Sequence, residues 1–535
     1  MSPGIFAKSK SENMEQYYEK IKPYLPYLIT LVAMWLIYIH FYSKDLLDNV
    51  PAVSLCMRAL LFVLVGYGCY LAYKRELTVE RLIWLCIFGG LVMRIGYTLY
   101  TPVDVRAHDL GDISEDSWGH AAYIFKLYLN GQLPASYDNL FYHPPFFHFV
   151  ASCFMKIFAS VDPEAELEVI FGASRLVSCF ASCSILFLLR SLCREFKCKP
   201  ETTCMIIAII AFQPNFYLLA GRVNNDSIAV ALLIFSFVML VKWYHSRKFS
   251  HLIGLAIGIG LGMMTKLNVS IIAFVAGPIM LYVFWQAIKE KKWKGLLAQY
   301  AVFAVICAPL GLWYSIRNFI SFHMPFGYVL DLEAAGNTLL YCGDKSFVAR
   351  FLSFPPDQLN TTPFCDAFSD YNVPLYLARS SIFGEFQYEG SETIAWLLLY
   401  TNIVLIVISI VARIAVIWKG KKLDPMLRYG CGAFWLVNMI SYVAFNIRYP
   451  QGCTMDFRYA VPTVICGAIY LALFRQQLRE YLAEQAPGKR ASGKSSSAPG
   501  NGSIKILVAK CTMWLITICC VLFILFSAYM FTNLS

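Results

Sequence analysis

The stretch FGASRLVSCFASCSILFLLRSLCREFKCK, residues 171–199, decides the fold class of this chain. Residues 171–192 are mostly apolar or small, and the cysteines among them act as small hydrophobic side chains. A helical run of about 20 such residues matches the thickness of the hydrocarbon core of a bilayer. The Arg and Lys residues that follow are typical of the cytoplasmic end of a membrane-spanning helix.

Apolar runs of this kind recur along almost the whole chain of 535 residues, which is 58% hydrophobic and only 15% charged. Its mean hydropathy of +0.56 excludes a soluble globular protein. We therefore predict an all-α, polytopic integral membrane protein with about 13 transmembrane helices. The predicted spans lie near residues 27–43, 55–74, 82–100, 171–192, 202–220, 228–244, 251–265, 269–287, 296–316, 394–418, 429–447, 457–475 and 511–531.

The net charge of +11 is distributed unevenly between the loops, which predicts topology rather than nucleic-acid binding. Lys and Arg concentrate in alternate loops, such as KRELTVER, KWYHSRK and KGKKLDPMLR, and the positive-inside rule places these loops and the N-terminus in the cytoplasm. Residues 101–170 and 317–393 are then large outer loops. To keep this alternation, the apolar segment 144–158 must lie on the membrane surface or dip into it.

The stretch VRAHDLGDISEDSWGHAAYI, residues 105–124, gathers carboxylates and histidines at the start of the first outer loop. Apolar residues recur at three- and four-residue steps from Trp118 to Leu129, which predicts an amphipathic helix along the membrane surface. Ser114 is the predicted N-cap of this helix, with Glu115 and Asp116 in its first turn.

Asp109 precedes the predicted cap, so capping does not explain it. A partly desolvated carboxylate at the polar end of a membrane helix can act as a base, and we predict a catalytic role for Asp109. A second polar motif, YHPPFFH at residues 142–148, contains His143. Two readings of His143 stay open, a turn residue or a contact to substrate.

Cations at the ends of predicted spans form a further set on the outer side. Each of them has a structural reading, in which a long side chain reaches from the helix end to the lipid headgroups. As a set they favour an anionic substrate, because Arg grips phosphate at two points and Lys supplies a point charge. The set comprises Lys266, Arg317, Arg448 and Arg458, with Arg222 and the pair Asn225 and Asp226 in the loop GRVNND.

The order of HD after a span, then GHAAYI, YHPPFFH, GRVNND, TKLN, RN followed by PFGYV, and MDFRYAVP resembles the family 39-like glycosyltransferases of the GT-C class. These are related to protein O-mannosyltransferases and lipid A aminoarabinose transferases. The resemblance covers residues 80–475. It implies many transmembrane helices, interfacial helices in the first outer loop and a catalytic acid near the start of that loop.

The resemblance also implies the reaction, transfer of a hexose-type sugar from a polyprenyl or dolichyl phosphate donor to an acceptor hydroxyl, with inversion. Asp109 takes the place of the catalytic acid, with Asp112 or Asp116 as the alternative, and His108 stands where the family more often has a second acid. The implied substrate-binding residues are His108, Asp112, Asp116, His120, His143, Asn225, Asp226, Lys266, Arg317, Arg448 and Arg458.

No cofactor or metal is firmly implied, although His108, Asp109, Asp112 and His120 could approach a divalent ion. The expected partners are the lipid-linked sugar donor, an unidentified protein, glycan or lipid acceptor and membrane lipids, without nucleic acid. The expected location is the plasma membrane in a bacterium or the endoplasmic reticulum membrane in a eukaryote, with the site on the outer or lumenal face.

We predict six parts along the chain. Residues 1–80 are a cytoplasmic tail and two added transmembrane helices, and residues 81–316 are the transmembrane core with the catalytic loop 101–170. Residues 317–393 form the large outer loop and residues 394–475 complete the core. Residues 476–508 are a flexible cytoplasmic linker, rich in Gly, Ser and Pro, and residues 509–535 are a terminal transmembrane helix.

The main rival from another class is a transporter or flippase of lipid-linked or small anionic substrates. Its candidate residues are the intramembrane cations Arg58, Arg94 and Arg413, which lack acidic partners in the predicted spans. Two further sequence features concern the outer loops: Cys342 and Cys365 could pair, and Asn225 begins a glycosylation sequon, NDS.

Overall fold

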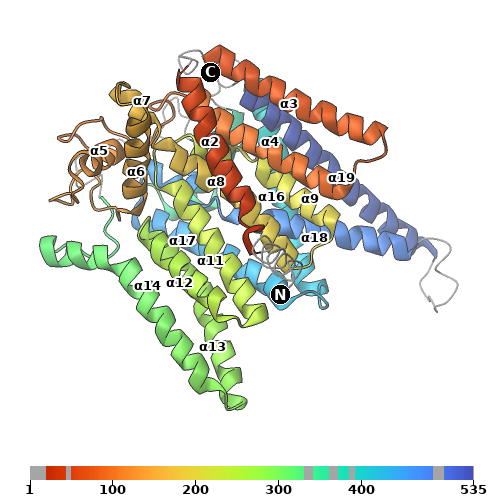
Figure 1. Cartoon of the computed structure of the whole chain (residues 1–535). Coiled ribbons are helices and arrows are strands. Elements are labelled where there is room, and N and C mark those ends of the chain that lie inside the picture. The colour runs from red at the N-terminus through yellow and green to blue at the C-terminus, as the bar shows by residue number, and fades with distance from the viewer. Residues whose placement is uncertain are drawn as a thin grey trace, which may run out of the picture.

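The computed structural model describes residues 20–43, 50–330, 341–360, 371–384, 392–485 and 499–533. Over these residues the protein is a bundle of helices, and extended pairing is limited to one antiparallel bridge between Tyr341 and Gln451 (Figure 1). The all-α prediction is confirmed. The predictions for the tail 1–19, for Cys365 and for linker residues 486–498 lie outside the described residues.

The helices follow one another in this order: α2 (Leu25–Ser43), α3 (Val50–Tyr73), α4 (Val79–Tyr100), α5 (Gly119–Asn130), α6 (Phe146–Val161), α7 (Leu167–Gly172), α8 (Arg175–Glu195), α9 (Pro200–Phe212), α10 (Pro214–Ala220), α11 (Asp226–Ser246), α12 (Phe249–Met263), α13 (Ala273–Lys289), α14 (Trp293–Phe322), α15 (Val373–Phe383), α16 (Glu392–Lys419), α17 (Cys431–Arg448), α18 (Thr463–Glu484) and α19 (Pro499–Thr532). Short 3₁₀ or π turns are η1 (Leu267–Ile272), η3 (Val348–Leu352), η4 (Pro356–Asn360), η5 (Met426–Gly430), η6 (Gly452–Met455) and η7 (Phe457–Tyr459).

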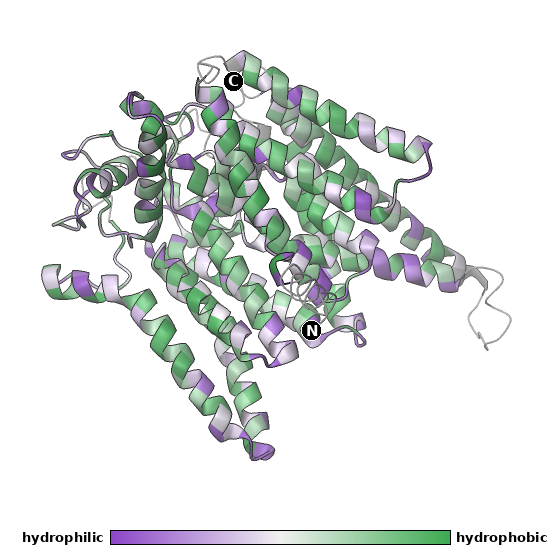
Figure 2. Ribbon diagram, viewed as in Figure 1, coloured by the Kyte–Doolittle hydropathy of each residue, from purple (hydrophilic) through white to green (hydrophobic). Residues whose placement is uncertain are grey.

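Ten helices of the described chain are long and apolar enough to cross a membrane, or 11 if one bent pair counts as a single span. Hydrophobic residues run along most of the length of these helices, as the colouring by hydropathy shows (Figure 2). The predicted count of about 13 is therefore not confirmed. Residues 202–220 divide into α9 and α10 with a bend of 51°, α12 has only 15 residues, and α18 begins at Thr463 rather than near residue 457.

Helix α6 occupies most of the segment predicted to lie at the membrane surface. Its buried residues, Phe147, Ala151, Met155 and Phe158, recur at three- and four-residue steps, whereas Phe149 on another face is 56% exposed. The helix has 16 residues, fewer than any of the ten spans. This length and one-sided burial fit a helix that packs on the bundle without crossing the membrane.

Arg94 explains how the break between α9 and α10 is tolerated inside the bundle. Pro214 begins α10 and cannot donate a backbone hydrogen bond, so carbonyls in the last turn of α9 lack helical partners. The fully buried Arg94 guanidinium donates to the carbonyls of Ile210 at 3.0 Å and Ala211 at 2.9 Å. The cation therefore caps the C-terminus of α9, where the helix dipole also favours positive charge.

We expect Arg94→Leu to lower the thermal unfolding temperature in detergent, because buried carbonyls left without a donor cost about 1–3 kcal/mol each. The matched control is Arg413→Leu, since the Arg413 guanidinium lies 3.4 Å from the centre of the Trp435 ring and is only partly buried. Loss of that contact costs about 0.5–2 kcal/mol. Equal decreases in both variants would contradict the capping role.

Ion pairs at one end of the bundle join loops that the distribution of Lys and Arg places on the same side of the membrane. His245 at the end of α11 contacts Glu195 of α8 at 2.8 Å and Asp424 at 2.9 Å. Three further pairs at this end are Glu80 with Arg190, Lys199 with Glu480 and Glu201 with Arg479. Loops that the charge pattern places on the same side of the membrane therefore lie together in the structure. That this side is the cytoplasmic one stays a prediction.

Helices α13 and α14 extend away from the rest of the bundle (Figure 1). The buried residues of α14 lie only in its second half, at Gly311, Tyr314, Ser315 and Asn318. Helix α14 packs closely against α12 there. A Cβ added at Gly311 would lie only 2.9 Å from the sulfur of Met263. The second half of α14 thus connects this pair of helices to the loop that holds the candidate site.

Candidate active site

Helix α5 begins at Gly119, so the predicted N-cap at Ser114 is wrong. The Trp118 side chain makes no capping hydrogen bond, and no acidic residue lies in the first turn. Backbone carbonyls cap the helix instead, because the preceding loop folds back over it. His120 N–H donates to the Asp109 carbonyl at 2.9 Å, and Ala121 N–H donates to the Leu110 carbonyl at 2.8 Å. The other end of the helix is at Gly131, which has the left-handed conformation.

This close backbone approach requires glycine at two positions. Gly119 has φ +84°, and a Cβ there would lie 2.6 Å from the Asp109 carbonyl oxygen. Gly111 has φ +67°, and a Cβ there would lie 1.7 Å from the Trp118 carbonyl oxygen. Asp109 itself has φ +55°, a conformation that costs a non-glycine residue about 1 kcal/mol or more. The folded loop therefore fixes the position of Asp109.

Arg458 brings carboxylates from three parts of the chain into one cluster. Its guanidinium lies 3.8 Å from Asp109, 4.0 Å from Asp226 and 3.6 Å from Asp456. Lys266 forms an ion pair with Asp226 and lies 5.0 Å from the centre of the Tyr459 ring. We name these residues, together with His108, the charge cluster.

The carboxylates of the charge cluster differ in exposure. The side chains of Asp226 and Asp456 are 5% and 0% exposed, whereas that of Asp109 is 47% exposed. Asp226 is paired with Lys266, and Asp456 accepts a hydrogen bond from the Arg458 backbone N–H. Among these three carboxylates, Asp109 is thus the one that an incoming hydroxyl group can reach.

The charges around Asp109 favour its ionised form. Burial raises the pKa of Asp109, but Arg458, followed by His108, His120 and Lys266, outweighs burial and lowers the pKa below its ordinary value. Burial, reinforced by Arg458 and Arg222, lowers the pKa of His108 well below its ordinary value, so His108 is neutral at neutral pH. His108 Nε2 lies 3.7 Å from Asp456.

Three histidines pack behind the charge cluster. His120 Nδ1 and His148 Nε2 are 2.9 Å apart, and the His120 and His143 rings stack at 5.7 Å. Burial lowers the pKa of His120 to about 4 and that of His143 well below its usual range. His148 in turn stacks on Tyr123 at 4.0 Å, so these neutral rings form a packed support for the start of α5.

The remaining predicted residues are placed differently. Asp112 and Asp116 lie exposed in the turn that precedes α5, outside the charge cluster. Arg317 on α14 donates to the Pro134 carbonyl at 2.6 Å and ties α14 to the loop after α5. Arg448 lies at the end of α17, where it lines a separate cavity.

Asn225 is 1% exposed and donates to the Thr265 carbonyl at 3.3 Å. Its place in an NDS sequence predicted a possible glycosylation site, but the folded chain does not expose the amide. Asn225 instead holds the short loop before α11 against the turn that carries Lys266, which keeps Asp226 and Lys266 within contact.

Asp456 is the site residue that sequence reasoning missed. Its motif, MDFRYAVP, draws attention to Arg458, whereas a buried aspartate two residues before an arginine gives no separate signal. Within the described chain, no group of three or more His, Cys, Asp or Glu side chains is arranged to hold a metal ion.

Residues 142–313 match the family model described as dolichyl-phosphate-mannose-protein mannosyltransferase. The resemblance to the GT-C class is confirmed. The matched segment contains Asp226 and Lys266 but not Asp109, Asp456 or Arg458, so the assignment of these three depends on the geometry described above. The segment is thus similar to a mannosyltransferase family, and the described chain has the many apolar helices of a multi-pass membrane protein.

Three solved structures show a distant likeness. The oligosaccharyltransferase AglB from Archaeoglobus fulgidus, in complex with an inhibitory peptide and a dolichol-phosphate, shares 13% identity at a TM-score of 0.40 over 83% of this chain and 55% of that one. An apo oligosaccharyltransferase from Archaeoglobus fulgidus shares 14% identity at 0.41, over 84% and 56%. ArnT from Cupriavidus metallidurans, bound to undecaprenyl phosphate, shares 12% identity at 0.42, over 85% and 75%.

The chain spans a little over half the length of these oligosaccharyltransferases. No curated protein sequence matches it.

We expect Gly119→Ala to speed amide hydrogen exchange across residues 109–121, because the added Cβ separates the Asp109 and Leu110 carbonyls from the first turn of α5. Gly131→Ala is the matched control at the other end of the same helix. Gly131 also has a positive φ, yet a Cβ there meets no atom within 4 Å. Similar exchange in the two variants would show that the close approach at Gly119 does not hold the loop.

Proposed function

We propose that this protein is a GT-C glycosyltransferase that moves a hexose-type sugar from a polyprenyl or dolichyl phosphate donor to an acceptor hydroxyl, with inversion, on the outer or lumenal face. The observation that carries the proposal is the charge cluster, in which a half-exposed Asp109 lies beside Arg458 while Asp226 and Asp456 are buried. The matched family, named for dolichyl-phosphate mannose, supports the class of donor.

In the proposed reaction, the acceptor oxygen attacks the anomeric carbon as the bond from that carbon to the phosphate oxygen breaks. Asp109 takes the proton of the hydroxyl, an assistance typically worth about 10²- to 10⁴-fold in rate. The lowered pKa of Asp109 keeps this carboxylate ionised and ready to accept the proton at neutral pH.

The departing lipid phosphate gains negative charge, which fixed cations can stabilise. Arg458 is 5% exposed and Lys266 is 16% exposed, and both lie within contact of Asp226. Buried ion pairs of this kind hold the cations in place before the reaction, so that little reorganisation is needed as the phosphate leaves.

The rival transporter reading depends on intramembrane cations that act on a substrate. In the structure Arg94 caps α9, Arg413 stacks on Trp435, and Arg58 donates to the Thr532 carbonyl near the end of α19. Each of these three cations therefore has a structural partner. They give the transporter reading no specific support.

We expect Asp109→Asn to lower sugar transfer from polyprenyl phosphate donors by about 10²-fold or more in reconstituted vesicles, because the amide cannot accept the proton. Asp112→Asn is the matched control, since Asp112 lies in the same loop outside the charge cluster. Full activity of the Asp109 variant would contradict the base assignment. Mass spectrometry of lipid-linked sugars in a deletion strain would identify the donor that accumulates.

The pH profile of transfer gives a separate test. Arg458 lowers the pKa of Asp109, so the ionised base persists as the pH falls and is lost only below that lowered pKa. We expect the acid limb to move to higher pH, by about one unit, in the residual activity of Arg458→Gln. Arg458→Lys keeps the charge and should leave the limb nearer its original position. An unmoved limb in the Gln variant would separate Arg458 from the titrating base.

A further inference from the structure

A second feature of the loop-bearing end is a cavity of about 440 Å³ that the charge cluster does not use. Its walls come from residues 325–329 after α14, from Tyr341 within the large loop and from residues 448–451 at the end of α17 and just after it. Cys342 N–H donates to the Pro450 carbonyl at 2.8 Å, beside the bridge between Tyr341 and Gln451. Three separated segments thus form one built pocket.

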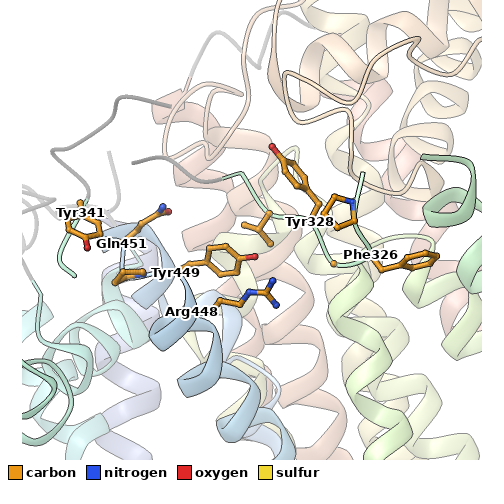
Figure 3. A pocket seen from close by; sticks show the side chains of 10 residues that line it. Phe326, Tyr328, Tyr341, Arg448, Tyr449 and Gln451 are labelled. Atoms are coloured by element: carbon orange, nitrogen blue, oxygen red, sulfur yellow. The ribbon is translucent and has the colours of Figure 1, made fainter. Parts of the chain in front are cut away.

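The side chains of the cavity combine aromatic rings with a single charge. Tyr328, Tyr341, Tyr449 and Phe326 surround it, and Figure 3 shows the Tyr449 ring and the Arg448 guanidinium between the Tyr341 and Phe326 sides. Arg448 is the one charged residue among the ten described residues that line the cavity. It lies 5.4 Å from the centre of the Tyr449 ring, a contact that orients the guanidinium.

This lining predicts the chemical class of the ligand. Aromatic side chains offer flat apolar faces together with hydroxyl groups, which suit a ring that has both C–H faces and hydroxyls. No acidic residue lies among the described residues of the wall, and the Arg448 guanidinium is suited to a carboxylate or phosphate, which it binds at two points. A saccharide that carries an anionic group meets both requirements.

Aromatic contacts connect the cavity to the part of the protein that holds the charge cluster. Tyr328 packs edge-on against Tyr142 with the ring centres 5.2 Å apart, and Tyr142 packs on His143 at 4.4 Å. Burial raises the pKa of Tyr142, and the negative charge of Asp109 raises it further, so Tyr142 lies near that carboxylate. Tyr142 therefore contacts both the cavity wall, through Tyr328, and the histidines behind the charge cluster, through His143.

The cavity does not suit the apolar chain of a polyprenyl donor. Among the described residues its aliphatic lining is Pro325, Val329 and Pro450, and these walls are loop segments and a helix end rather than the sides of spanning helices. A lipid tail needs a longer apolar surface. The acceptor is therefore the better occupant of this position.

We propose that this cavity binds the acceptor, and that the acceptor is a saccharide with a carboxylate or phosphate group held by Arg448. The inference rests on the proposed function in one respect, because the bound saccharide is an acceptor only if the protein transfers a sugar. Recognition of an anionic saccharide by Arg448 is a binding property and can be measured without any transfer.

The test measures binding to the full-length protein in lipid nanodiscs, with glucuronate, glucose 6-phosphate and neutral glucose oligosaccharides as probes. We expect tighter binding of the acidic probes, and we expect Arg448→Gln to weaken that binding by about tenfold or more while binding of neutral probes is retained. The preferred acidic probe distinguishes a carboxylate from a phosphate. Lys345→Gln is the control, since Lys345 is an exposed cation of the large loop that pairs with Asp344 and does not line the cavity.

Three outcomes would overturn the proposal: equal binding of acidic and neutral probes, equal losses in the Arg448 and Lys345 variants, or a loss in the Arg448 variant confined to polyprenyl phosphate. The last result would assign the cavity to the donor. Failure of the proposed function gives a different result. A fully active Asp109→Asn variant in the transfer assay would contradict the proposed function, and it would not change the measured binding of saccharides. In a transfer assay, Arg448→Gln should raise the acceptor KM far more than it lowers kcat.

Discussion

The position of Arg458 constrains the arrangement of the whole site. It is almost fully buried, and burial of an unpaired cation is expensive, so the fold must supply negative charge around it. Asp109 comes from the loop after α4, Asp226 from the start of α11 and Asp456 from the turn before α18. The electrostatic demand of one guanidinium therefore holds together parts of the chain that are separated by more than two hundred residues.

Much of the architecture was predictable because membrane insertion imposes a strong length requirement on helices. The predicted span 202–220 is bent by 51° where its second part is surrounded by protein. All seven residues of α10 are buried, and hydropathy alone joined this short helix to α9 in one span without the bend. The break depends on Gln213 and Pro214 together with Arg94, which is more than a hundred residues away. A local average cannot detect such a long-range cap.

The candidate site was predictable to a different extent. Residue type and position at a helix end were enough to single out Asp109, since a carboxylate there has few structural explanations. The role of Ser114 was predicted incorrectly, because a backbone carbonyl can cap a helix as well as a side chain can and leaves no sequence signal. The sequence also contained no sign that Arg448 and Arg458 lie in two different sites. Both lie at or after the end of the same helix, α17. In the structure the Arg458 guanidinium lies in the charge cluster, whereas Arg448 lines the aromatic cavity.

The full burial of α10 has a consequence for how this part of the chain tolerates change. A helix that faces lipid is constrained mainly by hydrophobicity, whereas α10 is constrained by volume and by hydrogen-bond geometry. Asn215, a polar residue inside the bundle, donates to the Ser380 and Ser381 carbonyls at the end of α15, and a Cβ at Gly221 would lie 2.6 Å from the Tyr97 ring. Substitutions in this segment should thus be ranked by shape and donor position, because a more hydrophobic side chain of the wrong size would disrupt the contacts with α4 and α15.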